Sequence, residues 1–370
     1  MTPPRVLHVY KDIHPEVPGG IERHIDDLRR HMPEVVSDVL IAARGCRATR
    51  SRSLPAGREV AVWQVGRVLS TPLTGGYPRW IRRLKPDVLH LHMPNPPAEL
   101  SVLTVPGDLP LVVSYHADVV RQAKLLRAYS VLIRRVLDRA DVVISGSQSL
   151  LRTSAFVKRV ADKTVVIPYG VDMGQFDRSK VAPEEILALT CPEGRRTVVA
   201  VGRLVHYKGF DRLIDLAGRI DGRLIIVGGG PLEASLRERA AGHPNVSLTG
   251  PVSDRALRAH LAAADVFVLP SVNRAESFGI ATIEAQAMGL AAVVTDVGTG
   301  TVEAVEDGVT GYVVPSAHDE ALVGRINLLL GDDELRSKMG DAARRRVVER
   351  FDVHQSVSSH LRIYRSLALR

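Results

Sequence analysis

Residues 265–289 read DVFVLPSVNRAESFGIATIEAQAMG, and the expected fold is worked out from this stretch. Its first six residues are an apolar run, which predicts a buried parallel strand entering a loop. The loop carries Glu276 and then the small, mobile Ser277-Phe278-Gly279, after which Glu284 lies in a helical pattern. A glycine between a strand and a helix lets backbone N–H groups approach a ligand, and the helix N-terminus favours an anion. We therefore expect an α/β unit that binds a phosphate at this turn.

Two carboxylates flank the predicted phosphate position. Glu276 precedes the turn and Glu284 lies on the helix, so hydroxyl groups on either side of a bound phosphate have an acceptor. A sugar nucleotide has this layout, with a phosphate in the middle and a polyol at each end. The alternative is a solvated helix with two surface glutamates, which is the more frequent case for a lone pair.

A basic loop earlier in the chain favours the ligand site. The loop Gly202–Gly209 follows a predicted strand at 198–201, precedes a predicted helix at 210–220, and carries Arg203 and Lys208. A guanidinium and an ammonium group held there match the two negative charges of a diphosphate. Surface salt bridges are the alternative for each cation. The chain has no Asp-x-Asp pair and no His/Cys cluster of metal spacing, so we expect charge stabilisation without a metal.

The rest of the second half alternates strands and helices. Strands are expected at 224–227, 246–248, 292–295 and 312–314, and helices at 232–241, 254–264, 319–330, 333–351 and 353–369. The glycine-rich run Gly228-Gly229-Gly230-Pro231 follows the first of these strands. Such alternation predicts a parallel sheet covered by helices.

The first half shows the same alternation. Strands are expected at 5–10, 35–42, 60–65, 87–92, 111–115, 141–145 and 164–167, helices at 21–32 and 117–140, a loop followed by a helix at 73–84, and a polar, Arg-rich loop at Arg44–Arg58. Gly19-Gly20 stands between the first strand and helix, where backbone amides approach a phosphate or the chain simply makes a tight turn. His116 follows a strand, and the carboxyl end of a parallel strand faces the ligand crevice of α/β folds. The alternative is a histidine that caps the next helix.

The domain boundary is predicted where the alternation of strands and helices stops. Pro168–Asp172 and the polar residues up to Arg196 interrupt it, so we place a linker there. The expected division is an α/β domain at 1–172, a second at 173–352 and a last helix at 353–370. A chain of 370 residues is long enough for two domains that each bury a core.

Composition narrows the class of protein. The 45% apolar and 24% charged residues are typical of a soluble globular chain, and no apolar run approaches the ~20 residues that cross a bilayer. The N-terminus lacks the apolar region of a secretory signal. Cys46 and Cys191 lie far apart and fit a reducing compartment, so we expect a cytoplasmic protein.

The positive charge lies in the first half. Residues 1–172 carry 25 Lys and Arg against 16 Asp and Glu, a net +9, whereas residues 173–370 carry 24 against 25, a net −1. A basic half predicts an anionic partner such as a membrane surface, a phosphorylated acceptor or nucleic acid. Nucleic acid fits least, because aromatic residues are only 4% of the chain. The helix at 117–140 has interleaved arginines, which predict a solvated basic face or peripheral contact with an anionic membrane.

These motifs, taken in order, resemble one family. Gly202-Arg203 with Lys208-Gly209, then the glycine-rich run at 228–231, then Glu276-Ser-Phe-Gly with Glu284, look like the retaining glycosyltransferases of family 4. The resemblance covers nearly the whole chain. It implies the GT-B fold of two Rossmann-like domains, the first for the acceptor and the second for the nucleotide sugar. It also implies that the last helix returns to the first domain.

The resemblance implies roles residue by residue. Arg203 and Lys208 would neutralise the departing diphosphate together with backbone amides around Phe278-Gly279-Ile280. Glu276 would hold donor-sugar hydroxyls, Glu284 the ribose, and His116 would approach the donor sugar. The remaining donor-side positions implied by the family pattern are Gly19, Gly20, Gly202, Gly229, Val252 and Ser277. No metal or other cofactor is implied, and no carboxylate acts as a covalent nucleophile.

Two departures from the family pattern bear on the donor. Tyr169 stands where relatives often have Asn in Pro-Asn-Gly-Val-Asp, and 298–303 read GTGTVE where many have Gly-Gly-x-Pro-Glu. The opening segment and the stretch around His116 resemble bacterial polysaccharide mannosyl- and rhamnosyltransferases, which favours a GDP-mannose-type donor over a UDP-sugar. Acceptors would be a glycan, a glycolipid or a small molecule. The alternatives are a non-catalytic sugar-nucleotide-binding subunit and a nucleotide-sugar epimerase, which would need a nicotinamide fingerprint and a Tyr-x3-Lys pair.

Overall fold

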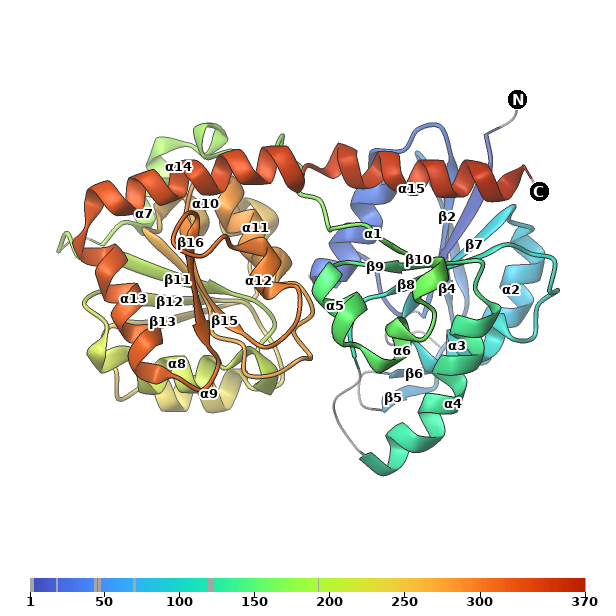
Figure 1. Ribbon diagram of the computed structural model, residues 1–370, viewed down its shortest axis with the longest axis horizontal. Helices are drawn as coiled ribbons and strands as arrows, with labels where there is room; N and C mark the ends of the chain where they lie inside the picture. Colours follow the sequence, from blue (N-terminus) through green and yellow to red (C-terminus); the bar gives the residue numbers. More distant parts are fainter. Residues whose placement is uncertain are drawn as a thin grey trace. The chain divides into compact units, whose positions relative to one another are not determined.

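The structure is a computed structural model that describes residues 3–17, 19–42, 45, 48–68, 71–118, 123–191 and 193–369, without the side chains of 123–128. The chain divides into two compact units (Figure 1). The first contains the residues up to Gly170 and those from Val353 onward, and the second is Val171–Asp352. Cys46 and Arg121 lie outside the described residues, and Cys191 is a buried free thiol.

An eight-stranded sheet forms the centre of the first unit, as far as that unit is described. Its strand order is β10-β9-β8-β7-β1-β2-β4-β3, and only β3 runs antiparallel to its neighbour. The strands are β1 Arg5–Val9, β2 Val36–Ala42, β3 Arg50–Leu54, β4 Gly57–Val62, β7 Val88–Met93, β8 Leu111–Tyr115, β9 Val142–Ser145 and β10 Thr164–Val166. A separate hairpin pairs β5 Gly66–Val68 with β6 Thr71–Leu73.

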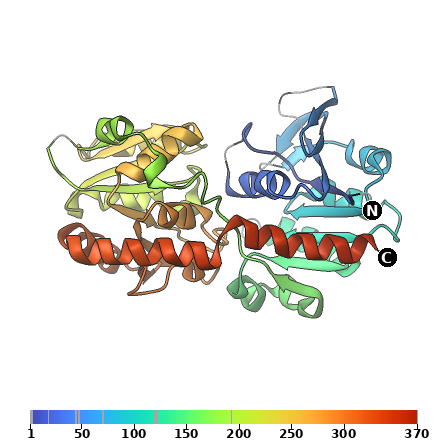
Figure 2. The same ribbon diagram turned by 90° about the horizontal axis from the view of Figure 1, so that it is seen from above.

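Helices cover both faces of this sheet. They are α1 Gly20–Arg30, α2 Tyr77–Leu84, α3 Pro96–Val102, α4 Ala123–Arg139, α5 Gln148–Thr153, α6 Ala155–Lys158, the 3-10 helix η1 Ala161–Lys163, and α15 Val353–Ala368. Leu89 and Leu91 of β7 pack with Ile81 of α2 in one core, while Val88 packs with Tyr364 of α15 in the other. Because strand residues alternate between faces, one strand serves both cores. The expected return of the last helix is confirmed, since α15 lies along α1 and β7 (Figures 1 and 2).

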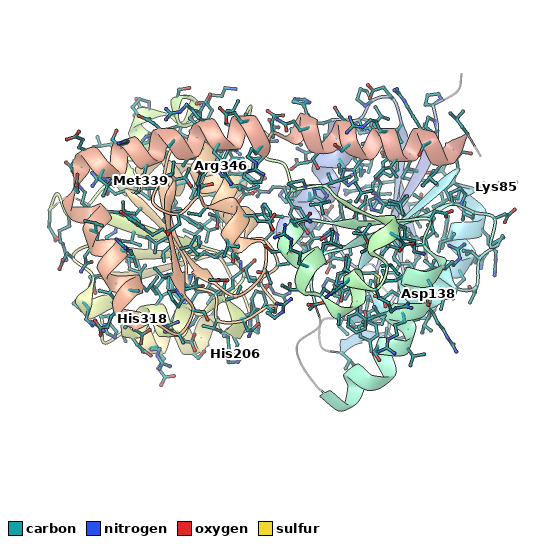
Figure 3. All side chains as sticks on the ribbon, in the orientation of Figure 1. Lys85, Asp138, His206, His318, Met339 and Arg346 are labelled. Carbon is teal, nitrogen blue, oxygen red and sulfur yellow. The ribbon has the colours of Figure 1, made fainter. Side chains whose placement is uncertain are left out.

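The second unit is a six-stranded parallel sheet with helices around it. Its strand order is β13-β12-β11-β14-β15-β16. The strands are β11 Thr197–Val201, β12 Arg223–Val227, β13 Val246–Gly250, β14 Val266–Leu269, β15 Ala291–Asp296 and β16 Gly311–Pro315. The helices are η2 Arg178–Lys180, α7 Pro183–Leu189, η3 His206–Lys208, α8 Phe210–Asp215, η4 Ala217–Arg219, α9 Glu233–Ala240, α10 Asp254–Ala263, α11 Ile280–Ala287, α12 Thr301–Ala304, α13 Asp319–Gly331 and α14 Asp333–Arg350. Met339 of α14 is buried in the core with β11 and β15 (Figure 3).

The strand order of each sheet reverses at its centre, which predicts the edge at which a ligand would bind. In the second unit the chain moves outward from β11 to β13, then returns to β14 beside β11 and moves outward again to β16. At such a reversal the loops after the two central strands diverge, and α/β folds bind ligands outside those carboxyl ends. In the first unit the reversal lies between β1 and β7. The loops after β11 and β14 are those that the sequence singled out.

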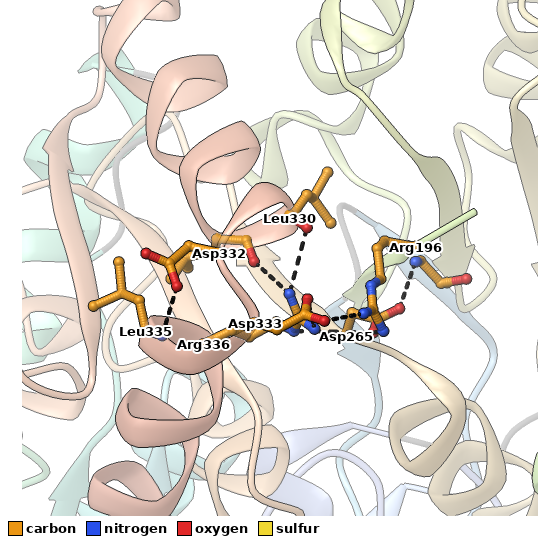
Figure 4. A network of polar contacts seen from close by, with 9 residues as sticks. Arg196, Asp265, Leu330, Asp332, Asp333, Leu335 and Arg336 are labelled. Atoms are coloured by element: carbon orange, nitrogen blue, oxygen red, sulfur yellow. Dashed lines mark hydrogen bonds and ion pairs between the residues drawn. The ribbon is translucent and has the colours of Figure 1, made fainter. Parts of the chain in front are cut away.

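The opposite edge of the second sheet is tied by a charged network. Arg196, just before β11, lies 3.0 Å from Asp265 and 2.6 Å from Asp333 (Figure 4). Arg336 pairs with the same Asp333 at 2.6 Å and donates to the carbonyl of Leu329 at 2.8 Å. These residues join the amino ends of the strands to α14. The network therefore supports the fold at the edge away from the crevice.

Some local expectations were wrong. The predicted loop Arg44–Arg58 contains the edge strand β3, whose RSRSL sequence has no apolar face because its side chains are largely exposed. The expected linker contains α7, and α3, which begins with two prolines, was not anticipated. The expected helix at 210–220 is divided into α8 and η4. Each of these segments is short, so it contains too few residues for the spacing of apolar side chains to predict a helix or a strand.

Candidate active site

Two loops meet at the carboxyl edge of the second sheet. Strands β11 and β14 are paired neighbours, and the loop after each contains predicted site residues. The N–H of Val272 donates to the carbonyl of Tyr207 at 2.9 Å, which joins the two loops directly. A Cβ on Gly209 would lie 2.2 Å from the carbonyl oxygen of Pro270. The loops are therefore packed against each other at the reversal of the sheet.

Lys208 and Glu276 form an ion pair in this position. Nζ of Lys208 lies 2.6 Å from Oε2 of Glu276, and Ser271 Oγ donates to the same oxygen at 3.2 Å. Both charged side chains are buried, with 8% and 7% exposure. Burial by itself lowers the pKa of Lys208, but the charge of Glu276, with contributions from Tyr207 and Glu284, holds that pKa above its ordinary value. The site thus keeps a buried ammonium group charged.

Arg203 presents the second cation differently. Its side chain is exposed, and within the described residues it has neither a hydrogen bond nor an ion pair. It follows Gly202, whose N–H donates to the carbonyl of Val227 at 3.0 Å at the end of β12. A guanidinium group that projects from a fixed strand end without a partner is available to a phosphate oxygen.

The turn into α11 provides backbone donors. Gly279 has φ +79° and precedes the first residue of the helix, Ile280. A side chain there would be strained by this φ, and its Cβ would lie 2.6 Å from Leu269. No acidic residue stands in the first turn of α11, and no described side chain caps it. The positive end of this helix is therefore open to an anion, while Glu284 lies further along the helix, largely buried.

Phe278 differs from the expected small, mobile segment. Its side chain is 1% exposed and meets Phe351 edge-on, with ring centroids 5.7 Å apart. Burial of an aromatic ring fixes the backbone on both sides of it. The segment Ser277–Gly279 is anchored by its central residue, and its amides are consequently held in place.

The glycine-rich run closes the other side of the site. Gly228 has φ +139°, and a Cβ there would lie 2.1 Å from the carbonyl oxygen of Gly202. A Cβ on Gly229 would lie 2.5 Å from Pro251, next to the half-buried Val252. The run lets the loops after β11, β12 and β13 approach each other closely. Gly202, Gly229 and Val252 are therefore brought together at one edge of this unit.

The predicted glycines of the first unit lie at the start of α1. Gly19 is the N-cap and Gly20 the first helical residue. The carboxylate of Glu22 folds back over Gly19, because a Cβ there would lie 2.2 Å from Glu22 Oε2. This carboxylate already faces the positive end of α1. A phosphate bound at Gly19-Gly20 would have to displace Glu22.

His116 lies at the end of β8 as expected, but inside the unit. Its side chain is 2% exposed, Nδ1 lies 2.7 Å from the Tyr169 hydroxyl, and Nε2 lies 3.0 Å from Nδ1 of His92. Burial lowers the pKa of His116 to about 3, with smaller effects of Lys11 and His360. The imidazole is neutral, and both of its nitrogens are paired within the first unit.

His116 belongs to a buried group of histidines that the sequence did not reveal. His92 Nε2 lies 3.1 Å from His8 Nδ1, and His90 bonds to Tyr364 and Ser114 at 2.6 and 2.8 Å. The ligand atoms of His8, His90 and His92 lie within 4.8 Å of one another, which is close enough for a metal ion. Both nitrogens of His90 and of His92 and the Nδ1 of His8 are already engaged in hydrogen bonds, however, and the ring centroids of His90 and His92 lie 4.1 Å apart. A metal ion would have to break that network.

Comparison with known proteins identifies the family. Residues 18–175 match the model of Glycosyltransferase Family 4, and residues 183–346 match that of glycosyl transferases group 1. The O-antigen chain mannosyltransferase C of Escherichia coli is 31% identical over 98% of both chains. The chain belongs to glycosyltransferase family 4. The D-rhamnosyltransferase WbpZ of Pseudomonas aeruginosa is 30% identical over 94% of this glycosyltransferase and 92% of its own chain.

Solved structures show the fold of this glycosyltransferase to be GT-B, as expected. Sucrose-phosphate synthase from Thermosynechococcus elongatus has a TM-score of 0.81 at 20% identity, covering 98% of this chain and 99% of its own. Anabaena HepE, solved with UDP-glucose, has a TM-score of 0.75 at 19% identity, covering 98% and 100%. No helix in the described residues of the glycosyltransferase has the length and apolar character needed to cross a bilayer.

Both departures from the family pattern make hydrogen bonds to predicted site residues. Tyr169 bonds to His116, and the Thr299 hydroxyl donates to the backbone carbonyl of Glu276 at 2.6 Å. The sequence marked both positions as unusual without assigning them a partner. Ser271 was missed altogether, because a serine at a strand end carries no distinctive pattern. In this glycosyltransferase the unusual residues are thus part of the site's support.

Proposed function

We propose that this glycosyltransferase moves a sugar from a nucleotide-diphosphate sugar to a hydroxyl of a glycan, glycolipid or small-molecule acceptor, with retention of configuration and without a metal ion. The observation that carries the proposal is the grouping of three positive elements at one strand edge. These are the buried, charged Lys208, the unpaired Arg203 and the open N-terminus of α11. A departing diphosphate needs this charge stabilisation, which other enzymes obtain from a divalent cation.

Each residue has a role in the proposed reaction. Arg203 and Lys208 neutralise the diphosphate as the glycosidic bond breaks, and the amides at Phe278-Gly279-Ile280 add to this. Glu276 accepts hydrogen bonds from donor-sugar hydroxyls, and Glu284 from the ribose. In the retaining reaction the departing phosphate takes the proton of the acceptor hydroxyl on the same face of the sugar.

The ion pair between Lys208 and Glu276 matters before the donor arrives. Each neutralises the other at 2.6 Å, so neither buried charge stands alone in the free enzyme. Lys208 carries three N–H donors and Glu276 two acceptor oxygens, which leaves capacity for a phosphate oxygen and a sugar hydroxyl. The pair is therefore compatible with binding both the phosphate and the sugar that the donor's sugar-phosphate bond joins.

His116 has a narrower role than a free imidazole would have. Since Tyr169 and His92 occupy its nitrogens, one of these bonds must open before a ring nitrogen meets a donor-sugar hydroxyl. Its low pKa excludes proton transfer from an imidazolium near neutral pH. We assign it to the donor sugar as a neutral hydrogen-bonding group.

A GDP-mannose-type donor is proposed ahead of a UDP-sugar. Two relatives at 30% identity or above are named as a mannosyltransferase and a D-rhamnosyltransferase, and one at 34% identity over 64% of this chain is named as a GDP-mannose-dependent mannosyltransferase of Mycobacterium tuberculosis, which supports a mannose-related donor. HepE supports the UDP alternative through the donor in its structure. Peripheral contact with an anionic membrane through the basic first half remains a prediction, as does a cytoplasmic location.

Calorimetric titration with GDP and with UDP, each in the presence of a chelator, tests the proposal. Tight binding of one nucleotide that persists in the chelator supports a metal-free diphosphate site, and a panel of sugars on that nucleotide then identifies the donor. Binding that requires a divalent cation would refute metal independence. A folded protein that binds neither nucleotide would refute the GDP- or UDP-sugar donor, whereas nucleotide binding without transfer from any sugar nucleotide would favour the non-catalytic subunit.

A further inference from the structure

Thr299 is fully buried in the loop between β15 and α12. Its hydroxyl donates to the carbonyl oxygen of Glu276 at 2.6 Å. The next residue, Gly300, donates its N–H to the carbonyl of Ser277 at 2.7 Å. Two successive residues of one loop therefore hold two successive carbonyls of the loop that carries the proposed sugar-binding carboxylate.

The same loop is fixed at its own start. Gly298 donates its N–H to Asp296 Oδ1 at 2.7 Å, and its carbonyl accepts from Arg274 Nη1 at 3.0 Å. The hydroxyl of Thr295, near the end of β15, donates to the carbonyl of Ser271, and the carbonyl of Leu269 lies further from it at 3.3 Å. The loop after β14 is thus held by the loop after β15 on either side of Glu276. Among these contacts between the two loops, the hydrogen bond from Thr299 is the one to the backbone of Glu276 itself.

The side chain of Glu276 is held separately from its backbone. Lys208 and Ser271 contact its carboxylate, whereas Thr299 contacts its carbonyl. The ion pair alone permits several backbone positions, because both side chains have rotatable bonds. A hydrogen bond on the carbonyl removes that freedom. The N–H of Glu276 also donates to the carbonyl of Asn273 at 3.2 Å, so the Thr299 hydroxyl is one of two hydrogen-bonding partners of the Glu276 backbone and the one supplied by the loop after β15.

We propose that Thr299 is a positioning residue, which fixes the backbone of Glu276 so that its carboxylate meets the donor sugar in the reactive geometry. The inference rests on the proposed function, since it takes Glu276 as the group that binds the sugar. Thr299 does not contact the donor in this assignment, because its side chain is fully buried and its hydroxyl proton is directed at the Glu276 carbonyl. Thr299 affects the sugar only through the position of Glu276, and it leaves binding of the nucleotide unaffected.

Three variants test this assignment. Thr299→Val keeps the shape of the side chain and removes its hydroxyl group, and Thr299→Ser keeps the hydroxyl group. Thr301→Val is the matched control, because Thr301 is also fully buried and donates to a backbone carbonyl, that of Thr295 at 3.2 Å. Thermal unfolding checks that each variant folds. Calorimetry with GDP and UDP, and kinetics with the sugar nucleotide that the wild type uses best, provide the functional measurements.

We expect Thr299→Val to bind the free nucleotide like the wild type and to lose about 10- to 100-fold in kcat, because displacement of a positioning group by ~1 Å has that effect. Thr299→Ser should recover kcat to within about threefold. Thr301→Val should fold less stably without losing kcat. Equal losses of kcat in both valine variants, or a failure of serine to restore it, would overturn the assignment.

Crystal structures separate this inference from the proposed function. In Thr299→Val the Glu276 carboxylate should move relative to the wild type, and in Thr299→Ser it should not. An unmoved Glu276 in Thr299→Val would overturn the positioning role whatever the activity. If Glu276 moves but the wild type transfers sugar from no GDP- or UDP-sugar, the positioning role stands and the proposed function fails.

Discussion

Nζ of Lys208 lies 2.6 Å from Oε2 of Glu276, and both side chains are buried at the reversal point of the second sheet. They come from loops 68 residues apart that the pairing of β11 with β14 brings together. A buried pair of this kind is weak evidence for stability, since desolvation opposes the attraction. We infer a functional role for the pair from its position at the carboxyl edge of the sheet, beside the uncapped N-terminus of α11.

The pair predicts strong coupling between its members. Lys208→Met leaves the Glu276 carboxylate buried without its cation, so the free energy of unfolding should fall by about 3–5 kcal/mol. The double variant Lys208→Met/Glu276→Gln should be less destabilised than Lys208→Met alone, because no uncompensated charge remains. Urea unfolding of the wild type, both single variants and the double variant measures this coupling. Additive effects would show that the two groups do not interact in solution.

Two arginines at opposite ends of β11 provide a test of the diphosphate site. Arg203→Ala should lower kcat/KM by roughly 100-fold or more, about 3 kcal/mol of transition-state stabilisation, with little change in unfolding. Arg196→Ala is the matched control, because it removes an equally long cation from the charged network at the amino edge. Its partly exposed ion pairs contribute up to ~1 kcal/mol to stability, and its kinetics should match the wild type. Normal turnover by Arg203→Ala would mean that the site is wrongly assigned.

Much of the fold was readable from the chain because strand and helix patterns there are long. In the second unit, a few neighbouring residues are enough to predict each of three features. These are strand β14 from its apolar run, the turn at Gly279, and the basic loop that contains Arg203 and Lys208. The pairing of Lys208 with Glu276 was not readable, because it depends on which strands become neighbours. Edge strand β3 escaped prediction since an exposed strand lacks an apolar face.

The first unit shows a different limit of sequence reasoning. His116 was placed at the end of a strand correctly, yet nothing in its local pattern indicates that both ring nitrogens are paired. Its partners, His92 and Tyr169, lie 24 and 53 residues away. Thr299 and Glu276 are 23 residues apart, and only the adjacency of β14 and β15 joins them. Such sites depend on which strands lie next to each other, and a single sequence does not show these contacts between distant residues.

Tyr169 should control the hydrogen bonding of His116. In Tyr169→Phe the Nδ1 of His116 loses its 2.7 Å partner, whereas the ring still packs on Gly146 and against His24. We expect a change in the side-chain nitrogen chemical shifts of His116 in NMR spectra, without loss of folding. Tyr115→Phe is a control, because that hydroxyl bonds to Asp118 instead. Unchanged His116 nitrogen shifts in Tyr169→Phe would refute the contact.

The buried histidines predict instability in mild acid. Burial lowers the pKa of His8 and His116 to about 3 and that of His360 to about 4, while unfolded histidine titrates near 6.5. Between these values the unfolded chain binds more protons, so the stability present above about pH 6.5 is lost as the pH falls. The free energy of unfolding should decrease steeply from pH 7 to pH 5. Burial also holds the pKa of His92 well below its ordinary value, so replacing His92 by Asn should reduce that slope by up to about 1.4 kcal/mol per pH unit.

Glu99 predicts the opposite pH dependence. Its side chain is fully buried in α3, where Tyr129 and the N–H of Asn95 donate to Oε1 at 2.6 and 2.7 Å and Oε2 has no partner. Burial raises the pKa of Glu99 to about 7, and the two hydrogen bonds oppose this only in part. The folded chain therefore binds the proton more tightly than the unfolded chain. Stability contributed by neutral Glu99 is fully present below pH 4.5 and is lost as the pH rises through 7.

Glu99→Gln isolates this effect, because the amide keeps the acceptor for Tyr129 and cannot ionise. The free energy of unfolding of the variant minus that of the wild type cancels the common contribution of the histidines. This difference should increase between pH 4.5 and pH 8, by on the order of 3 kcal/mol for the full shift. Tyr129→Phe, which removes a donor to the ionised form, should raise the pKa of Glu99 further and move the transition to higher pH. A difference that stays constant from pH 4.5 to pH 8 would show that Glu99 is ionised in the folded enzyme throughout, and its burial would then need a cation that the described residues do not provide.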